Sequence, residues 1–328
     1  MRVLLTGAGG MLGRATARAL LAEGVALTVL QRRPSGLGCR EVLADVADPL
    51  AVRQAAAGQH AVLHLAAKVD VVGPWGEYER TNVGGTRAVI AACHDNRVPV
   101  LVHVSTPAVA HAGRALVGAG AGPADPSRAR GHYARSKALA ELLALGADSP
   151  ELAVLAVRPH LVWGPGDTQL VAPVVHRAGT GRLPLIGSGA ALVDTTYVDN
   201  AVDALLAALR RCPDVHGQAL VVSNGEPRPV AEILSRVCRA AGVPGPRGRV
   251  PFPVANAAGA VIETVWTGLG RRSTPPLNRF LAEQLATAHW FDQRHTREVL
   301  RWRPRVSLAD GFSRLAEHYA AASGHISD

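Results

Sequence analysis

The chain has 328 residues, of which 48% are hydrophobic and 19% are charged, and this composition excludes a disordered protein. The formal net charge of +9 raises the question of nucleic-acid binding, but the arginines occur singly or in pairs, without a basic block or an aromatic platform. We therefore expect no nucleic-acid partner, and an anionic cofactor or substrate explains the charge better.

Cysteine spacing and apolar runs bear on the compartment. The cysteines are Cys39, Cys93, Cys212 and Cys238. They form no CxxC or Cys–His spacing, so we expect reduced thiols in a cytoplasmic protein and no metal site. The first apolar run breaks at Gly7, too early for a signal peptide. Residues 253–270 form the longest apolar stretch, which is too short and too interrupted to span a membrane. We expect a helix that covers a pocket.

Short β-branched runs alternate with helical patterns in the first half of the chain. Strands are predicted at residues 2–6, 26–30, 41–45, 61–65, 100–105 and 152–157. Helices are predicted near residues 11–23, 49–57, 78–96 and 132–146. The alternation predicts an α/β fold with a parallel sheet covered on both faces. Ligands of such a sheet bind beyond the carboxyl ends of its strands.

Beyond residue 160, Pro and Gly interrupt this pattern. A strand–helix pair at 192–209 and another near 219–241 precede a mostly helical end, so we expect a smaller, helix-rich C-terminal lobe. Residues 113–131 are low in complexity and lie just before Tyr133, and they predict a mobile loop over the site.

A glycine-rich turn joins the first strand to the first helix. Gly7, Gly10 and Gly13 allow a tight turn and the close approach of a pyrophosphate to the helix N-terminus. The position of this triplet makes it a strong signal of dinucleotide binding, and we place Met11 and Leu12 at the same contact.

The second strand ends in a segment that favours NADP(H). Where an NAD site usually offers a carboxylate to the ribose, this chain has Gln31 followed by Arg32 and Arg33. Guanidinium groups suit a 2′-phosphate. NAD(H) stays as the alternative cofactor, with both arginines then ordinary loop residues.

The segment "GHYARSK" carries one of the two lysines of the chain, Lys68 and Lys137. On a helix, Tyr133 and Lys137 lie one turn apart on one face. An ammonium near a phenol stabilises the phenolate and lowers the phenol pKa, and it also offers a compact donor to a cofactor ribose. The fifth strand ends at Ser105 and Thr106, where a hydroxyl polarises a substrate carbonyl.

The combined motifs resemble the extended short-chain dehydrogenase/reductase family, within the NAD-dependent epimerase/dehydratase superfamily. These motifs are the glycine turn, "HLAA", "TNVGGT", "VSTPAV", YxxxK and "RPHLVWGPGD", in this order. The resemblance implies a Rossmann-type doubly wound NAD(P)-binding domain at residues 1–160, with elements returning at about 192–223. It also implies a substrate-binding lobe made of residues 161–191 and 224–328.

The same resemblance assigns roles to residues. Thr106, Tyr133 and Lys137 would be catalytic, with Asn82 supporting them. Thr106 is preferred to Ser105 because the second hydroxyl matches the position of the family's catalytic residue. Further cofactor contacts are expected from Asp45, Val46, Leu65, Ala66, Ala67, Pro159 and Val162. Family members often pair as homodimers through the helices near 78–96 and 132–146, and we expect the same contact here.

One departure points to a branch of the family. Sugar-nucleotide enzymes commonly have an Arg before the residue equivalent to Asp194, and this chain has Val193. "LVDTTYVDN" and the C-terminal segment are similar to the 3β-hydroxysteroid dehydrogenase-like branch. We therefore predict an NADP(H)-dependent oxidoreductase that interconverts a ketone and a secondary alcohol on a bulky hydrophobic substrate, such as a steroid, a polyketide or a long-chain β-keto acid. The alternatives are a sugar-nucleotide epimerase or dehydratase with tightly bound NAD, and a non-catalytic NADP(H) sensor.

Overall fold

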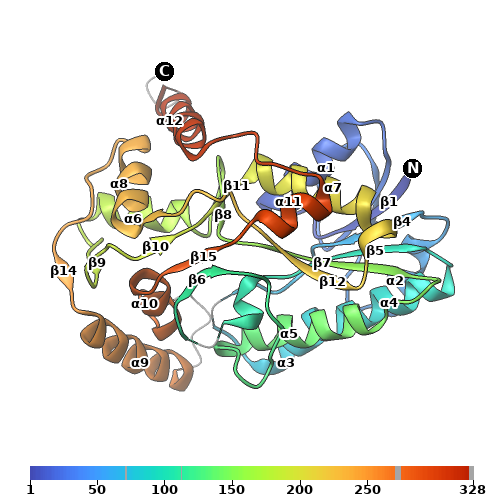
Figure 1. The fold of residues 1–328 in the computed structure, drawn as a ribbon, viewed down its shortest axis with the longest axis horizontal. Coiled ribbons are helices and arrows are strands. Elements are labelled where there is room, and N and C mark those ends of the chain that lie inside the picture. The colour runs from blue at the N-terminus through green and yellow to red at the C-terminus, as the bar shows by residue number, and fades with distance from the viewer. Residues whose placement is uncertain (71, 112, 270–274, 325–328) are drawn as a thin grey trace.

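A computed structural model of the chain describes residues 1–70, 72–111, 113–269 and 275–324. Its main sheet has seven parallel strands in the order β3-β2-β1-β4-β5-β7-β12 (Figure 1). These strands are β1 (Arg2–Thr6), β2 (Ala26–Gln31), β3 (Arg40–Leu43), β4 (Ala61–His64), β5 (Val100–Val104), β7 (Ala153–Pro159) and β12 (Gln218–Val222). The order reverses direction at β1, which confirms the predicted doubly wound α/β fold.

Helices cover both faces of this sheet (Figure 1). One face is covered by α1 (Met11–Ala22), α7 (Val198–Val215) and α11 (Arg294–Leu300), and the other by α2 (Pro49–Ala56), α4 (Gly85–Asp95) and α5 (Gly131–Gly146). Within β1, Val3 and Leu5 face the first layer whereas Leu4 faces the second, and all three are fully buried. Continuous apolar strands are stable here because successive side chains enter two separate cores.

The predicted helix at 49–57 matches α2 closely because its start is encoded locally. Asp48 caps the helix, and its carboxylate accepts hydrogen bonds from the backbone N–H groups of Leu50 at 3.0 Å and Ala51 at 3.2 Å. Pro49 occupies the first helical position, where its missing N–H leaves no donor unpaired.

The helix predicted at 78–96 is instead three consecutive segments. These are α3 (Trp75–Tyr78), the π-helical η1 (Glu79–Gly84) and α4. Asn82 lies within η1 and is 1% exposed, and its side chain bonds to groups outside the helix. A π-helical turn re-aims side chains relative to an α-helix, and sequence periodicity does not signal it.

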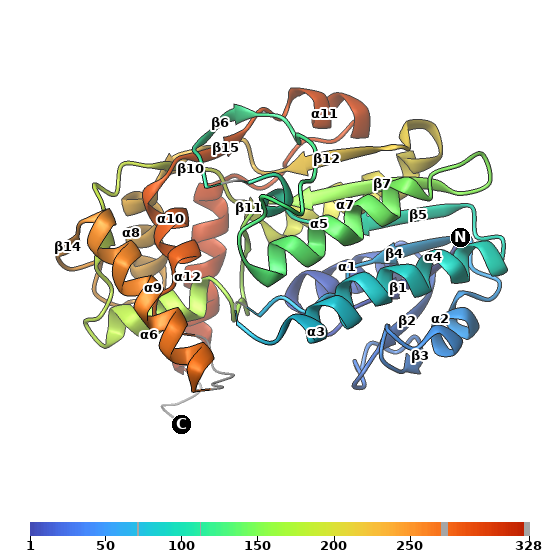
Figure 2. The same cartoon turned by 90° about the horizontal axis from the view of Figure 1, so that it is seen from below.

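A smaller lobe lies beyond the carboxyl ends of the main strands, as Figures 1 and 2 show. Its four-stranded sheet has the order β13-β10-β15-β6, formed by β13 (Arg228–Pro229), β10 (Leu192–Val193), β15 (His289–Phe291) and β6 (Leu116–Ala119). Its helices are α6 (Val171–Gly179), α8 (Val230–Ala240), α9 (Phe252–Gly268), α10 (Arg279–Ala286) and α12 (Leu308–Gly324). Two further strand pairs are β8 (Val162–Trp163) with β11 (Thr196–Tyr197), and β9 (Leu185–Ile186) with β14 (Arg249–Val250).

Two expectations about connecting segments differ from the structure. Residues 113–131 were predicted as a mobile loop, but they contain β6, which pairs in parallel with β15. Within residues 192–223, β12 joins the main sheet whereas β10 joins the small one. Both pairings link segments distant in sequence, which local patterns do not reveal.

Residues 253–268 of the predicted apolar stretch lie in α9, residue 269 forms a turn, and residue 270 lies outside the described residues. Within the described ranges, no helix is both long and apolar enough to cross a membrane. One side of α9 leaves Val254, Val261 and Val265 exposed.

Candidate active site

The structure brings together a threonine, a tyrosine and a lysine at the carboxyl edge of the main sheet. Thr106 directly follows β5 and caps the short helix η2 (Pro107–Ala110), where its hydroxyl accepts a hydrogen bond from the Ala108 N–H at 3.3 Å. The same hydroxyl lies close enough to the phenol of Tyr133, in the first turn of α5, to lower the pKa of that phenol. The Ser105 hydroxyl, by contrast, is buried without a hydrogen-bond partner among the described residues.

The environment of Tyr133 keeps its phenol protonated in the chain alone. Burial raises the pKa of Tyr133 to about 12, and the nearby Thr106 hydroxyl opposes this shift. The expected lowering of this pKa by Lys137 is not seen among the described groups. The reason is geometric, because the Lys137 ammonium is held by backbone and imidazole acceptors of β5.

Lys137 lies one turn after Tyr133 and is 3% exposed. Its Nζ donates to the Val104 carbonyl oxygen at 2.6 Å and lies 3.5 Å from Nε2 of His103. Burial lowers the pKa of Lys137 to about 8, and the Glu141 carboxylate opposes this shift. Lys137 is thus charged at neutral pH but close enough to its pKa to exchange protons.

The second lysine, Lys68, is held by ion pairs and by hydrogen bonds to its backbone. The Lys68 ammonium forms ion pairs with Asp70 at 2.6 Å and Glu77 at 3.1 Å. Its backbone is gripped by Asn82, whose Oδ1 accepts from the Lys68 N–H at 2.7 Å and whose Nδ2 donates to the Lys68 carbonyl at 3.1 Å. Both lysines of the chain therefore occupy sites that a compact ammonium fits.

The side chain of Asn82 is linked to the helix of Tyr133 through Ser136, and among the described residues it has no hydrogen bond to the hydroxyl of Thr106 or Tyr133. Its Nδ2 donates to the Ser136 hydroxyl at 2.8 Å, and this hydroxyl donates in turn to the Tyr133 carbonyl at 2.9 Å. Asn82 thus ties the loop after β4 to the first turn of α5, and the π-helical turn directs its side chain there.

A buried ion pair fixes α5 on the sheet. Arg158 in β7 and Glu141 in α5 are each 1% exposed, and Arg158 Nε donates to the Glu141 carboxylate at 2.8 Å. The guanidinium also donates to the backbone carbonyls of Ala121 and Gly122. Arg158 therefore connects the sheet, the helix of Tyr133 and the segment that follows β6.

The sequence reasoning missed Arg158, Glu141, Ser136 and His103. For two of these a signal was available. His103 and Arg158 are polar residues inside otherwise apolar strand runs, and buried polar residues of this kind are uncommon enough to mark a special role.

The glycine-rich turn fits a dinucleotide. A side chain at Gly7 would place its Cβ 2.7 Å from the Ala66 backbone N, and one at Gly13 would place it 2.1 Å from the Gly7 carbonyl oxygen. These two glycines let the turn, α1 and the end of β4 pack closely. At Gly10, the N-cap of α1, no atom lies within 4 Å of such a Cβ, so space is free where the helix N-terminus would meet a pyrophosphate.

The end of β2 also fits the cofactor. Gln31 is 8% exposed, yet neither its Oε1 nor its Nε2 has a hydrogen-bond partner among the described residues. A buried amide without partners is costly, and a ribose hydroxyl would satisfy it. Arg32 and Arg33 follow directly and are exposed.

The other predicted cofactor residues lie at the carboxyl ends of neighbouring strands. Leu65, Ala66 and Ala67 follow β4, Pro159 ends β7, and Val162 begins β8. Asp45 and Val46 follow β3, but both are engaged within the chain. Asp45 pairs with Arg80 at 2.9 Å, and Val46 is 5% exposed in the core of the second face.

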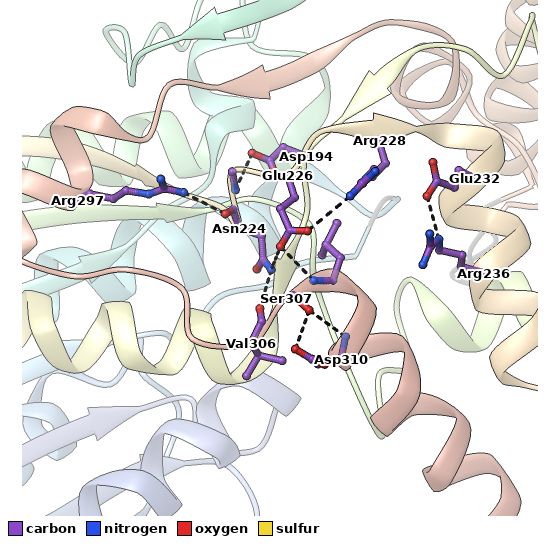
Figure 3. A network of polar contacts seen from close by, with 12 residues as sticks. Asp194, Asn224, Glu226, Arg228, Glu232, Arg236, Arg297, Val306, Ser307 and Asp310 are labelled. Carbon is purple, nitrogen blue, oxygen red and sulfur yellow. Dashed lines mark hydrogen bonds and ion pairs between the residues drawn. The ribbon is translucent and has the colours of Figure 1, made fainter.

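Asp194, which marks the branch in the sequence, has a structural role. It is fully buried, and its carboxylate accepts a hydrogen bond from the Ser223 hydroxyl at 2.5 Å. The N–H groups of Gly225 and Glu226 also donate to it, both at 3.2 Å, within the network around Asn224 and Glu226 that Figure 3 shows. Burial raises its pKa to about 6, and these hydrogen bonds counteract the shift. The Glu226 carboxylate accepts from the N–H of Leu308 at 3.1 Å, so the same loop also caps α12.

Residues 3–223 match the family described as the NAD dependent epimerase/dehydratase family. The chain belongs to this family. The chain is 40% identical to the 2-alkyl-3-oxoalkanoate reductase of Stenotrophomonas maltophilia (strain K279a), over 98% of this chain and 100% of that protein. It is 27% identical to the Homo sapiens sterol-4-alpha-carboxylate 3-dehydrogenase, decarboxylating, over 97% and 88% of the two chains.

Among solved structures, a double mutant of the dTDP-glucose 4,6-dehydratase DesIV from Streptomyces venezuelae, with NAD bound, superposes with a TM-score of 0.75 at 23% identity. The match covers 99% of this chain and 98% of that one, and at this identity it shows the fold alone. The reductase and dehydrogenase relatives confirm the prediction of a family oxidoreductase acting on CH–OH/C=O groups, in the 3β-hydroxysteroid dehydrogenase-like branch.

Proposed function

We propose that the chain is an NADP(H)-dependent ketoreductase that reduces a β-keto acid carried on a hydrophobic skeleton, with 2-alkyl-3-oxoalkanoates as the first candidates. The observation that carries this proposal is the proximity of the Thr106 hydroxyl, at the end of β5, to the Tyr133 phenol, in the first turn of α5, which brings a polarising hydroxyl and a proton donor together. A carbonyl oxygen between these two groups would replace their mutual contact by two hydrogen bonds of its own.

The names of the two relatives share one piece of chemistry. In a 2-alkyl-3-oxoalkanoate, the ketone carbon is bonded directly to the carbon that bears the carboxylate. The same is true of the product of oxidising the 3-hydroxyl of a sterol-4-carboxylate. Both are therefore β-keto acids with an alkyl-substituted carbon between the two groups. This shared unit, rather than either skeleton, defines the substrate class that we propose.

The chain's residues take the following parts. The cofactor, held by the glycine-rich turn and the end of β2, would supply the hydride for the carbonyl carbon when it is bound. Thr106 holds the carbonyl oxygen, and Tyr133 gives it the phenolic proton, so the ketone becomes a secondary alcohol. The phenolate that remains takes a proton back from water, and the Lys137 ammonium offers a hydrogen-bond donor to the cofactor ribose.

The activity is tested in the direction of alcohol oxidation, because the β-keto acid substrate of the reverse reaction loses CO₂ spontaneously. The purified chain is incubated with a 2-alkyl-3-hydroxyalkanoate and NADP⁺, and we expect absorbance at 340 nm to grow with enzyme concentration. Secondary alkanols that lack the carboxylate are the control. No turnover with any β-hydroxy acid, together with NAD retained through purification, would favour the sugar-nucleotide alternative.

Cofactor preference is expected to depend on Arg32 and Arg33. Replacing both with Ala should weaken NADPH binding by about 10–100-fold, which corresponds to about 1.4–2.8 kcal/mol for the pair. Charge-assisted contacts to a 2′-phosphate are strong, but both arginines are exposed, so solvent screening reduces their contribution. NADH binding should change by less than about threefold. Fluorescence titration of the apo protein measures both affinities, and equal losses for the two cofactors would refute the 2′-phosphate role.

A further inference from the structure

The Lys137 ammonium has three N–H donors, and the structure shows partners for two of them. One donates to the Val104 carbonyl at 2.6 Å, and Nε2 of His103 lies 3.5 Å from the same nitrogen. Since an ammonium only donates, Nε2 must be the acceptor, and the ring proton of neutral His103 is then on Nδ1. The third N–H is left for the cofactor.

His103 is costly in this position. It is fully buried, and its Nδ1 has no hydrogen-bond partner among the described residues. An unsatisfied buried N–H costs about 1–3 kcal/mol, whereas Leu or Val would suit the apolar strand β5. A role at the site would explain why this strand has His103, which weakens the fold, in contact with the buried ammonium of Lys137.

We propose that His103 is a positioning residue that holds the ammonium of Lys137 against the Val104 carbonyl and keeps it charged. The effect on turnover rests on the proposed function, but the contact itself does not. The neighbouring histidine cannot replace His103, because His64 already uses both ring nitrogens, at 2.7 Å to Thr6 and 3.1 Å to Thr86.

Among the charged and titratable groups around Lys137, His103 can be replaced without breaking an ion pair or removing the proposed proton donor. On α5, Glu141 raises the pKa of Lys137 but is itself paired with Arg158 of β7. Tyr133, on the same helix, stays protonated near neutral pH. On β4, burial and the Lys137 charge lower the pKa of His64 to about 3, so it is neutral. On β5, burial, the Lys137 charge and the neighbouring His64 hold the pKa of His103 well below its usual value.

The composition makes the test direct, because the chain has two lysines. Protein labelled with ¹³C at lysine Cε gives two signals by NMR, and Lys137→Met identifies the one from Lys68. We titrate the apo wild type, His103→Leu and His103→Gln. In His103→Leu the pKa of Lys137 should fall by about one unit, because the charged form loses an acceptor. His103→Gln, which has an amide oxygen, should recover part of this shift.

Two further readouts separate positioning from packing. His103→Leu should be at least as stable to urea as the wild type, and its affinity for NADPH should fall about three- to tenfold. Gln59→Leu is the matched control. It also removes a buried polar side chain, whose Oε1 has no hydrogen-bond partner among the described residues, but it lies next to the N-terminal end of β4. This change should leave the Lys137 pKa unchanged.

An unchanged Lys137 pKa in folded His103→Leu would overturn the proposal. If His103→Leu fails to fold, an unchanged pKa in His103→Gln and unchanged NADPH affinity would overturn it equally. A wild type that turns over no β-hydroxy acid refutes the proposed function instead, while the apo titration still decides the role of His103.

Discussion

Replacing Tyr133 with Phe is expected to lower kcat by about 10²–10⁴-fold, which approaches complete loss of turnover. The change removes the phenolic proton donor and nothing else, since Phe keeps the ring and its packing. The affinity for NADPH should stay within about twofold of the wild type, because α5 and Lys137 remain in place. Steady-state kinetics and fluorescence titration of the same preparation measure the two quantities.

Tyr319→Phe is the matched control for this experiment. Tyr319 lies in α12, outside the proposed site, so the same loss of one hydroxyl should leave kcat within about twofold. If Tyr133→Phe retained more than about a tenth of the wild-type kcat, another group would have to supply the proton and the assignment of Tyr133 would be wrong.

Replacing Arg158 with Met is expected to give the largest loss of stability, about 3–5 kcal/mol in the free energy of unfolding. The change leaves the Glu141 carboxylate buried at 1% exposure without its guanidinium partner, and it also leaves the Ala121 and Gly122 carbonyls without their donor. Urea unfolding followed by circular dichroism measures the loss.

Two controls identify the cause of that loss. The double variant Arg158→Met with Glu141→Leu removes both charges and should recover much of the stability, because the buried uncompensated carboxylate is gone. Arg210→Ala breaks an exposed pair with Glu23 and should cost less than about 1 kcal/mol. A loss in Arg158→Met no larger than that of Arg210→Ala would contradict the account of a buried pair.

Sequence patterns located most of the main sheet, because its strands are apolar runs separated by amphipathic helices. They also placed Gly7, Thr106, Tyr133 and Lys137 at the ends of neighbouring elements, since a parallel sheet brings the carboxyl ends of its strands to one edge. The enzyme class was predicted from the family resemblance. A homodimer formed through α4 and α5 remains a prediction. On this surface the two helices line a shallow hollow of about 450 Å³.

Tertiary structure decided what surrounds these residues. The contact of Lys137 with His103, the pair of Arg158 with Glu141 and the pairing of β6 with β15 each join segments distant along the chain. The π-helical turn at Asn82 likewise depends on partners at Lys68 and Ser136. Local periodicity identifies which residues can form an element, but the partner of a buried polar group is chosen by three-dimensional packing, where each donor and acceptor removed from water must find another.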